Sequence, residues 1–175
     1  MLRGGETVAI LVLLSTTVPL AAQQVQLGAR AAIGQGAGWT SSGMDATTSA
    51  GLRVQLNWSR WGSYALVSRR VVPVVCLITD THCSDDDAIE TSVGVSRLGG
   101  TAEGIRGQFS LGVGILRWME TEPFGEAEAA VRFPLFGAVG IDVGVRGMAT
   151  PRALGKDIRD PWNVDLTAGI SVVLN

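Results

Sequence analysis

The sequence predicts an all-β fold, an eight-stranded antiparallel up-and-down β-barrel that spans a membrane. Apolar residues make up 46% of the 175 residues and charged residues 17%, yet after the N-terminal segment no apolar run reaches the roughly 18 residues that a membrane helix needs. Apolar and polar residues instead alternate in eight segments, which is the period of a strand with two unlike faces. The connections between these segments vary between short and long, as in barrels of this class.

The N-terminal segment has the pattern of a secretory signal peptide. Arg3 precedes an apolar stretch at 8–14, and the small residues Ala21 and Ala22 precede the first polar pair. The stretch is too short to cross a bilayer as a helix, which favours cleavage near Ala22 over a membrane anchor. We therefore expect a signal peptide at 1–22 and an outer-membrane barrel domain at 23–175.

The alternation is clear in seven segments and ambiguous in one. In the second, Leu52 and Val54 belong to the apolar phase while Arg53 and Gln55 belong to the polar phase. In the third both phases hold apolar residues, so its register stays open. The eight expected strands are 25–34, 50–59, 63–72, 89–96, 105–115, 126–133, 139–146 and 163–174.

The connections also indicate a barrel. Short ones are expected at 60–62, 99–104 and 134–135, and longer, mostly polar ones at 35–49, 73–87, 120–125 and 148–161. Outer-membrane barrels have tight periplasmic turns at one end and longer external loops at the other. We therefore expect short periplasmic turns and longer external loops.

The residue types of the polar phase indicate which face is inside. This phase holds glycine, alanine, serine and charges of both signs, which suit an eight-stranded interior just wide enough for side chains to fill it. A soluble lipocalin-like binder, with apolar residues inside, is the alternative; outward Leu52, Val54, Ile141 and Val143 would decide against it. The expected lumen charge network is Arg30, Arg53, Glu90, Glu126, Glu128, Arg132, Asp142, Arg146 and Asp165.

The ten aromatic residues lie near strand ends or in connections, as in the aromatic girdles at membrane interfaces. Phe109 is one of them. The others, which we expect at the interfaces, are Trp39, Trp58, Trp61, Tyr64, Trp118, Phe124, Phe133, Phe136 and Trp162.

With its signal peptide, eight alternating segments and alternating connections, the chain resembles the small eight-stranded outer-membrane barrels of the OmpA and OmpX type over residues 25–174. The resemblance implies assembly by the barrel-assembly machinery, although the sequence ends on Leu174 and Asn175 and not on the usual aromatic residue. We expect no peptidoglycan-binding domain after the barrel.

The connection at 73–87 holds the remaining candidate chemistry. Cys76 and Cys83 are expected to form a disulfide in an exported protein, because two cysteines and one histidine are too few ligands for a zinc site. His82 and Ser84 have the His-x-Ser spacing of outer-membrane lipid A deacylases, but the segment reads as loop. The aspartates at 80–87 form an acidic cluster, more typical of a solvated loop than of a cation site.

These observations favour a non-enzymatic outer-membrane barrel with a structural or surface-interaction role, in envelope integrity and loop-mediated binding, without cofactor or metal. Expected partners are outer-membrane lipid, lipopolysaccharide and the barrel-assembly machinery, with the chain a monomer. The net charge of −2 gives no field for nucleic acid. A narrow transport barrel is the main alternative; a lipid A-modifying enzyme and the lipocalin-like binder are further alternatives.

Overall fold

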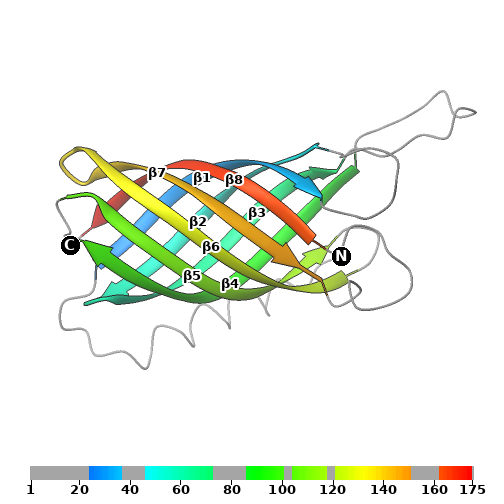
Figure 1. The fold of residues 1–175 in the computed structure, drawn as a ribbon, viewed down its shortest axis with the longest axis horizontal. Coiled ribbons are helices and arrows are strands. Elements are labelled where there is room, and N and C mark those ends of the chain that lie inside the picture. Colours follow the sequence, from blue (N-terminus) through cyan, green and yellow to red (C-terminus); the bar gives the residue numbers. More distant parts are fainter. Residues whose placement is uncertain are drawn as a thin grey trace, which may run out of the picture.

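A computed structural model describes residues 24–36, 46–72, 86–100, 104–117, 121–150 and 162–174. They form a closed barrel in which each strand pairs antiparallel with the next and β1 pairs with β8 (Figure 1). Among these residues no helix is long and apolar enough to cross a membrane. The strands are β1 (Gln24–Gly36), β2 (Ala46–Trp58), β3 (Trp61–Val72), β4 (Asp86–Gly100), β5 (Arg106–Arg117), β6 (Thr121–Phe136), β7 (Val139–Ala149) and β8 (Trp162–Leu174).

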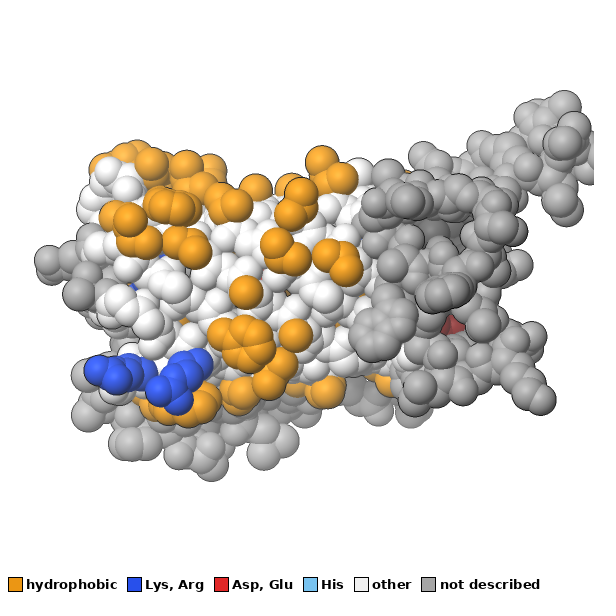
Figure 2. Space-filling model, in the orientation of Figure 1, with side chains coloured by type: hydrophobic (Ala, Val, Ile, Leu, Met, Phe, Trp, Pro, Cys, Tyr) orange, Lys and Arg blue, Asp and Glu red, His pale blue; other side chains and the backbone are white. Residues whose placement is uncertain are grey.

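The apolar phase of the strands points outward, as predicted. Leu52 is 67% exposed and Val143 48% exposed, whereas the charged side chains of Glu90 and Asp165 are 0% exposed. Apolar side chains are spread over the outer wall of the barrel (Figure 2). This is the inverse of a soluble barrel, whose apolar side chains fill the interior.

The third strand shows why its register stays open in the sequence. Val67 is 51% exposed on the outer wall, while Tyr64 and Leu66 are 3% and 2% exposed inside the barrel. Both faces of β3 therefore carry apolar residues, and alternation alone does not distinguish them.

Two of the connections that differ from the prediction border β6, which is longer than its alternating core. It begins at Thr121, and residues 118–120 are all that separate it from β5. Its inward phase runs through Phe124, while Pro123 and Gly125 lie on the outward phase. At the other end β6 reaches Phe136 through a register shift after Pro134, and the turn is formed by Gly137, whose φ of 52° favours glycine, and Ala138.

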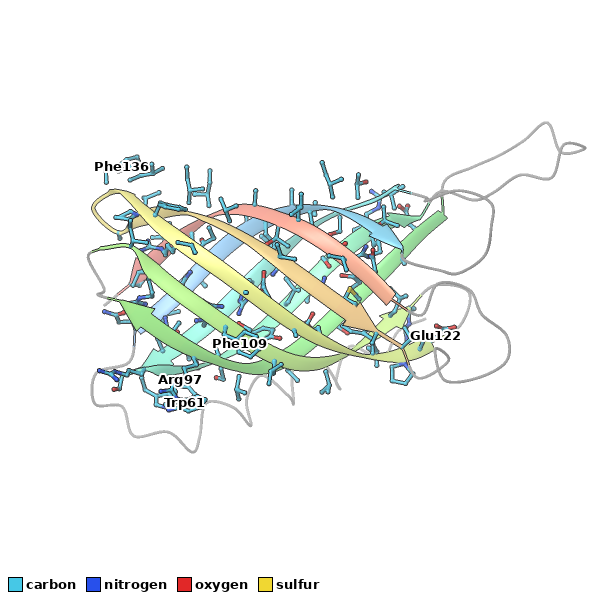
Figure 3. The ribbon with its side chains drawn as sticks, in the orientation of Figure 1. Trp61, Arg97, Phe109, Glu122 and Phe136 are labelled. Atoms are coloured by element: carbon cyan, nitrogen blue, oxygen red, sulfur yellow. The ribbon has the colours of Figure 1, made fainter. Side chains whose placement is uncertain are left out.

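Charged and aromatic residues mark both edges of the apolar outer wall. At the loop end, Arg69 of β3 pairs with Asp87 of β4 on the outside. At the turn end, the Arg97 guanidinium lies 5.4 Å from the ring centroid of Trp61, and both are labelled in Figure 3. At about 3.3 Å per residue and a tilt of about 40°, the part of β4 between Asp87 and Arg97 spans roughly 25 Å along the barrel axis.

Candidate functional site

The loop end of the lumen is closed by five charged side chains from five strands, here called the loop-side cluster. Arg70 of β3 pairs with Glu90 of β4 and, at 2.5 Å, with Asp165 of β8. Arg146 of β7 lies 3.0 Å from Glu90 and 3.7 Å from Asp165, and its Nε donates to Glu126 of β6 at 2.6 Å. Two cations thus bridge three carboxylates across the interior.

Neutral side chains complete the loop-side cluster. Tyr64 donates its hydroxyl to Glu126 at 2.6 Å, and Ser68 donates to Glu90 at 2.8 Å. The ring of Phe124 lies 5.7 Å from the Arg146 guanidinium. Because each carboxylate accepts from an arginine and several also from hydroxyl or amide groups, the buried charges are compensated.

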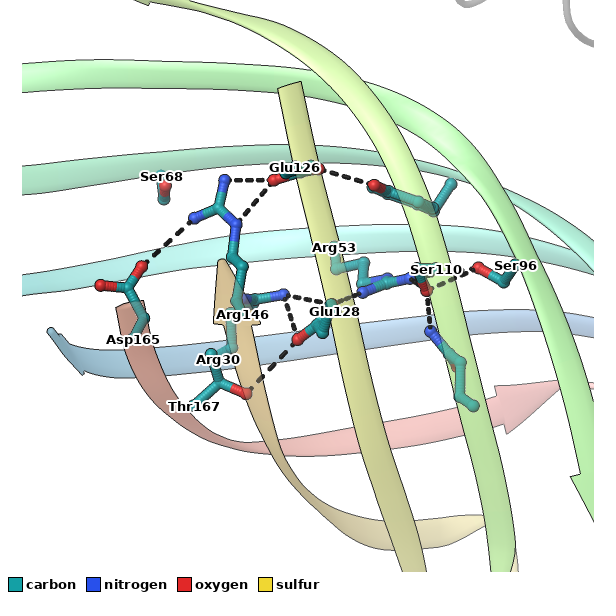
Figure 4. Close-up of polar contacts among 12 residues, drawn as sticks. Arg30, Arg53, Ser68, Ser96, Ser110, Glu126, Glu128, Arg146, Asp165 and Thr167 are labelled. Carbon is teal, nitrogen blue, oxygen red and sulfur yellow. Dashed lines mark hydrogen bonds and ion pairs between the residues drawn. The ribbon is translucent and has the colours of Figure 1, made fainter. Parts of the chain in front are cut away.

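A second group of contacts, the central cluster, lies beside the first (Figure 4). Arg30 of β1 and Arg53 of β2 both donate to Glu128 of β6, at 3.1 and 2.5 Å. Arg53 also donates to Ser110 at 3.0 Å, and Thr167 donates to Glu128 at 3.3 Å. The central cluster therefore ties β1, β2, β5, β6 and β8 together across the lumen.

Glycine makes room for this interior at a few points. A Cβ on Gly112 would lie 2.2 Å from the Tyr64 hydroxyl and 3.0 Å from Glu126. The hydrogen bond between Tyr64 and Glu126 thus depends on a missing side chain on β5.

A cavity of about 50 Å³ remains between the central cluster and the turn end. It has room for a few water molecules, and three polar atoms of its lining residues, Gln26 Oε1, Arg30 Nη2 and Arg53 Nε, are buried without a hydrogen-bond partner. The lumen is therefore incompletely filled toward the turn end. The residues that line the cavity include Gln26, Arg30, Arg53, Gln108, Asp142 and Ser171.

The structure places all nine charged residues of the expected lumen network on the inward phase of their strands. Two further arginines, Arg70 and Arg106, lie on the inward phase and are absent from the expected network. Arg70 lies in the strand whose register the sequence leaves open, and Arg106 lies on the same phase of its strand as Ser110. Arg70 is two residues after Ser68 and therefore on the same face of the strand, which is the sequence signal that identifies it as an inward residue.

The aromatic prediction is wrong for two residues and lies outside the described side chains for three. Tyr64 and Phe124 are each 3% exposed inside the lumen. Tyr64 shares its inward phase with Arg70 and contacts Glu126; Phe124 shares its phase with Glu126, and its ring lies beside Arg146. Trp61, Phe133 and Phe136 are exposed on the outer wall near the turn end, and Trp58 shares their outward phase. The structure does not describe Trp39, Trp118 or the side chain of Trp162.

The signal segment, Cys76, Cys83, His82 and Ser84 also lie outside the described residues. Within the described ranges no group of three or more histidine, cysteine or acidic side chains could hold a metal ion.

Comparisons with known proteins agree with this geometry at the level of fold. The chain has TM-score 0.62 and 14% identity to the crystal structure of Neisserial surface protein A, covering 86% of this chain and 96% of that one. The fold is that of the small eight-stranded outer-membrane barrels. For Ail, the attachment invasion locus protein of Yersinia pestis, in complex with the heparin analogue sucrose octasulfate, the TM-score is 0.50 at 12% identity, covering 87% and 97%.

No family model matches the chain, and no curated protein matches it.

Proposed function

We propose that the chain is a non-enzymatic barrel of the outer membrane with a structural or surface-interaction role, in envelope integrity and binding through its loop-end connections. The observation that carries the proposal is the combination of an apolar outer wall with a lumen closed by the ion-paired loop-side cluster. Such ion pairs stabilise the barrel and leave little room for ions or water to pass through it. The amino-acid sequence of the loop-end connections can then change without disturbing the barrel, which suits these connections to binding.

The two similar structures support this proposal. One is a surface protein, and the other is an attachment protein crystallised with a heparin analogue. We propose outer-membrane lipid and lipopolysaccharide as surroundings of this chain, the barrel-assembly machinery as its assembly partner, and a monomer as its working form.

Cell fractionation tests the location. The full chain, expressed in a Gram-negative host, is expected in the outer-membrane fraction with heat-modifiable gel mobility, because a closed barrel resists detergent unfolding until heated. Recovery in the soluble periplasm would contradict the proposal.

Replacing the connection at 37–45 with a Gly-Ser segment of equal length tests the role of the loops. Cell-surface binding is expected to fall while heat-modifiable mobility stays unchanged. A matched replacement of the turn residues Ser59 and Arg60 with Asn-Gly serves as control. Equal binding by both variants and the parent chain would contradict a role for this connection.

The cavity toward the turn end favours a narrow transport barrel as the second candidate. Liposome swelling and planar-bilayer recording separate the two: the closed lumen predicts no steady current. Lipid A mass spectra from cells with and without the protein test a modifying enzyme, and unchanged spectra are expected.

A further inference from the structure

Two arginines lie side by side at the turn end of the lumen without an ion pair. Arg106 of β5 and Arg132 of β6 are direct cross-strand partners, which places their Cα atoms about 4.5–5.5 Å apart. Both side chains point inward, and the residues are 8% and 5% exposed. No ion pair in the described part of the chain includes either of them.

Hydrogen bonds hold both guanidinium groups at the mouth. Arg132 donates through Nε to Ser171 at 3.1 Å and through Nη2 to the carbonyl of Ala138 in the last turn at 2.7 Å. Gly140 leaves space for it, since a Cβ there would lie 2.7 Å from Arg132 Cζ. Arg106 reaches across the lumen and donates through Nη2 to Gln24 Oε1 of β1 at 3.3 Å.

The same mouth contains two buried donors without partners. Arg106 Nη1 makes no hydrogen bond. Asn57, the cross-strand partner of Gln24, is 3% exposed; its Oδ1 accepts from Gln55 at 2.7 Å, while its Nδ2 has no partner. Buried donors of this kind normally find an acceptor, so these two N–H groups are available to a further acceptor at the mouth.

The charge at the mouth indicates what kind of acceptor fits. Asp142 of β7 is the cross-strand partner of Arg132, but it forms no ion pair with Arg132 or with any other residue that the structure describes. Two buried arginines thus face one carboxylate, and a buried positive charge without a counterion is costly. Water could satisfy the free donors but would not balance this charge.

We propose that the turn end of the lumen is a binding site for a phosphate-type oxyanion, with Arg106 Nη1 and Asn57 Nδ2 as donors and Arg132 as the second positive charge. An oxyanion accepts several hydrogen bonds at once and pairs well with guanidinium groups. The phosphate can be free inorganic phosphate or part of a phospholipid headgroup at the membrane surface.

The first experiment uses inorganic phosphate and the barrel folded in a detergent without phosphate groups. Urea unfolding is measured in potassium phosphate and in potassium chloride of equal ionic strength. At ten times its dissociation constant, phosphate should lower the unfolding equilibrium constant about elevenfold. Arg106→Gln should abolish this effect. Arg117→Gln, which removes the same charge from an exposed position at the loop end, should retain it.

The second experiment tests the lipid source. The parent chain and Arg106→Gln are compared in bilayers of phospholipid and of uncharged galactolipid. If the ligand is a headgroup, the parent chain gains stability over the variant only in phospholipid.

Asn57→Asp keeps the acceptor for Gln55 and places a fixed carboxylate beside Gln24, so it should fold and lose the phosphate response even if Arg106→Gln fails to fold. A phosphate effect limited to detergent assigns the site to the free anion, and an effect limited to phospholipid bilayers assigns it to the headgroup. Identical responses of the parent chain and these variants in both experiments would overturn the proposal.

Discussion

Replacing Arg146 with methionine tests whether the loop-side cluster stabilises the barrel. Arg146 is 1% exposed and contacts Glu126, Glu90 and Asp165. Methionine keeps much of its length but none of its charge. Removing one partner of a buried ion pair costs about 3–5 kcal/mol, because the other charge remains buried and unpaired.

The structure places the expected loss at the lower end of that range. Arg70 still pairs with Glu90 and Asp165, and Tyr64 still donates to Glu126. Only Glu126 loses its cation. We therefore expect Arg146→Met to lower the free energy of unfolding by about 3 kcal/mol, or more than a hundredfold in the equilibrium constant at roughly 1.4 kcal/mol per tenfold.

The assay is urea unfolding of the refolded barrel in lipid vesicles, followed by tryptophan fluorescence. Adding Glu126→Gln to Arg146→Met should restore about 1–2 kcal/mol, because the amide removes the unpaired charge. Arg69→Met, at the exposed pair with Asp87, should change stability little. A loss below about 1 kcal/mol for Arg146→Met, or no recovery in the double variant, would refute the reasoning. Planar-bilayer current should stay at baseline, since Phe124 still occupies the lumen.

Three further substitutions test other parts of the molecule. Leu52→Arg, in the middle of the outer wall, should cost about 2–4 kcal/mol in vesicles; an unchanged unfolding midpoint would contradict a lipid-facing Leu52. Gly112→Ala should reduce folding yield by displacing Tyr64, whereas Gly125→Ala, whose Cβ meets nothing within 4 Å, should not; equal yields by gel mobility would contradict the close approach. Tyr64→Phe should cost about 1.5–3 kcal/mol in the same unfolding assay, because the phenol donates to the Glu126 carboxylate; an unchanged unfolding free energy would show that this hydrogen bond contributes nothing.

The strand number and the direction of both faces could be predicted because they depend on local alternation. Leu52 and Arg53 illustrate this: neighbours in one strand must point to opposite faces, and the small and charged residues of the polar phase suit a narrow interior that side chains fill. Nothing beyond one segment is needed for that inference.

The pairings inside the lumen could not be predicted, because they depend on register between strands far apart in the sequence. Arg70 meets Asp165 from 95 positions away, and Tyr64 meets Glu126 from 62 positions away. An aromatic residue near a strand end fits a membrane interface equally well when only its own strand is considered. Tyr64 can point inward because Gly112 on β5 provides the space for its hydroxyl.

The distribution of charge along the lumen bears on conduction independently of how tightly it is packed. Among the described residues, the loop-side cluster holds two arginines and three carboxylates, while the rest of the lumen toward the turn end holds four arginines, namely Arg30, Arg53, Arg106 and Arg132, and two carboxylates, Glu128 and Asp142. An anion that enters from the turn end is first attracted by the net positive half and then repelled by the net negative half. A cation that enters from the loop end is first attracted by the net negative half and then repelled by the net positive half. Either ion is held before it crosses, because the field of one half opposes the ion that the other half attracts. The charge pattern that favours an anion at the turn end therefore also opposes a steady current.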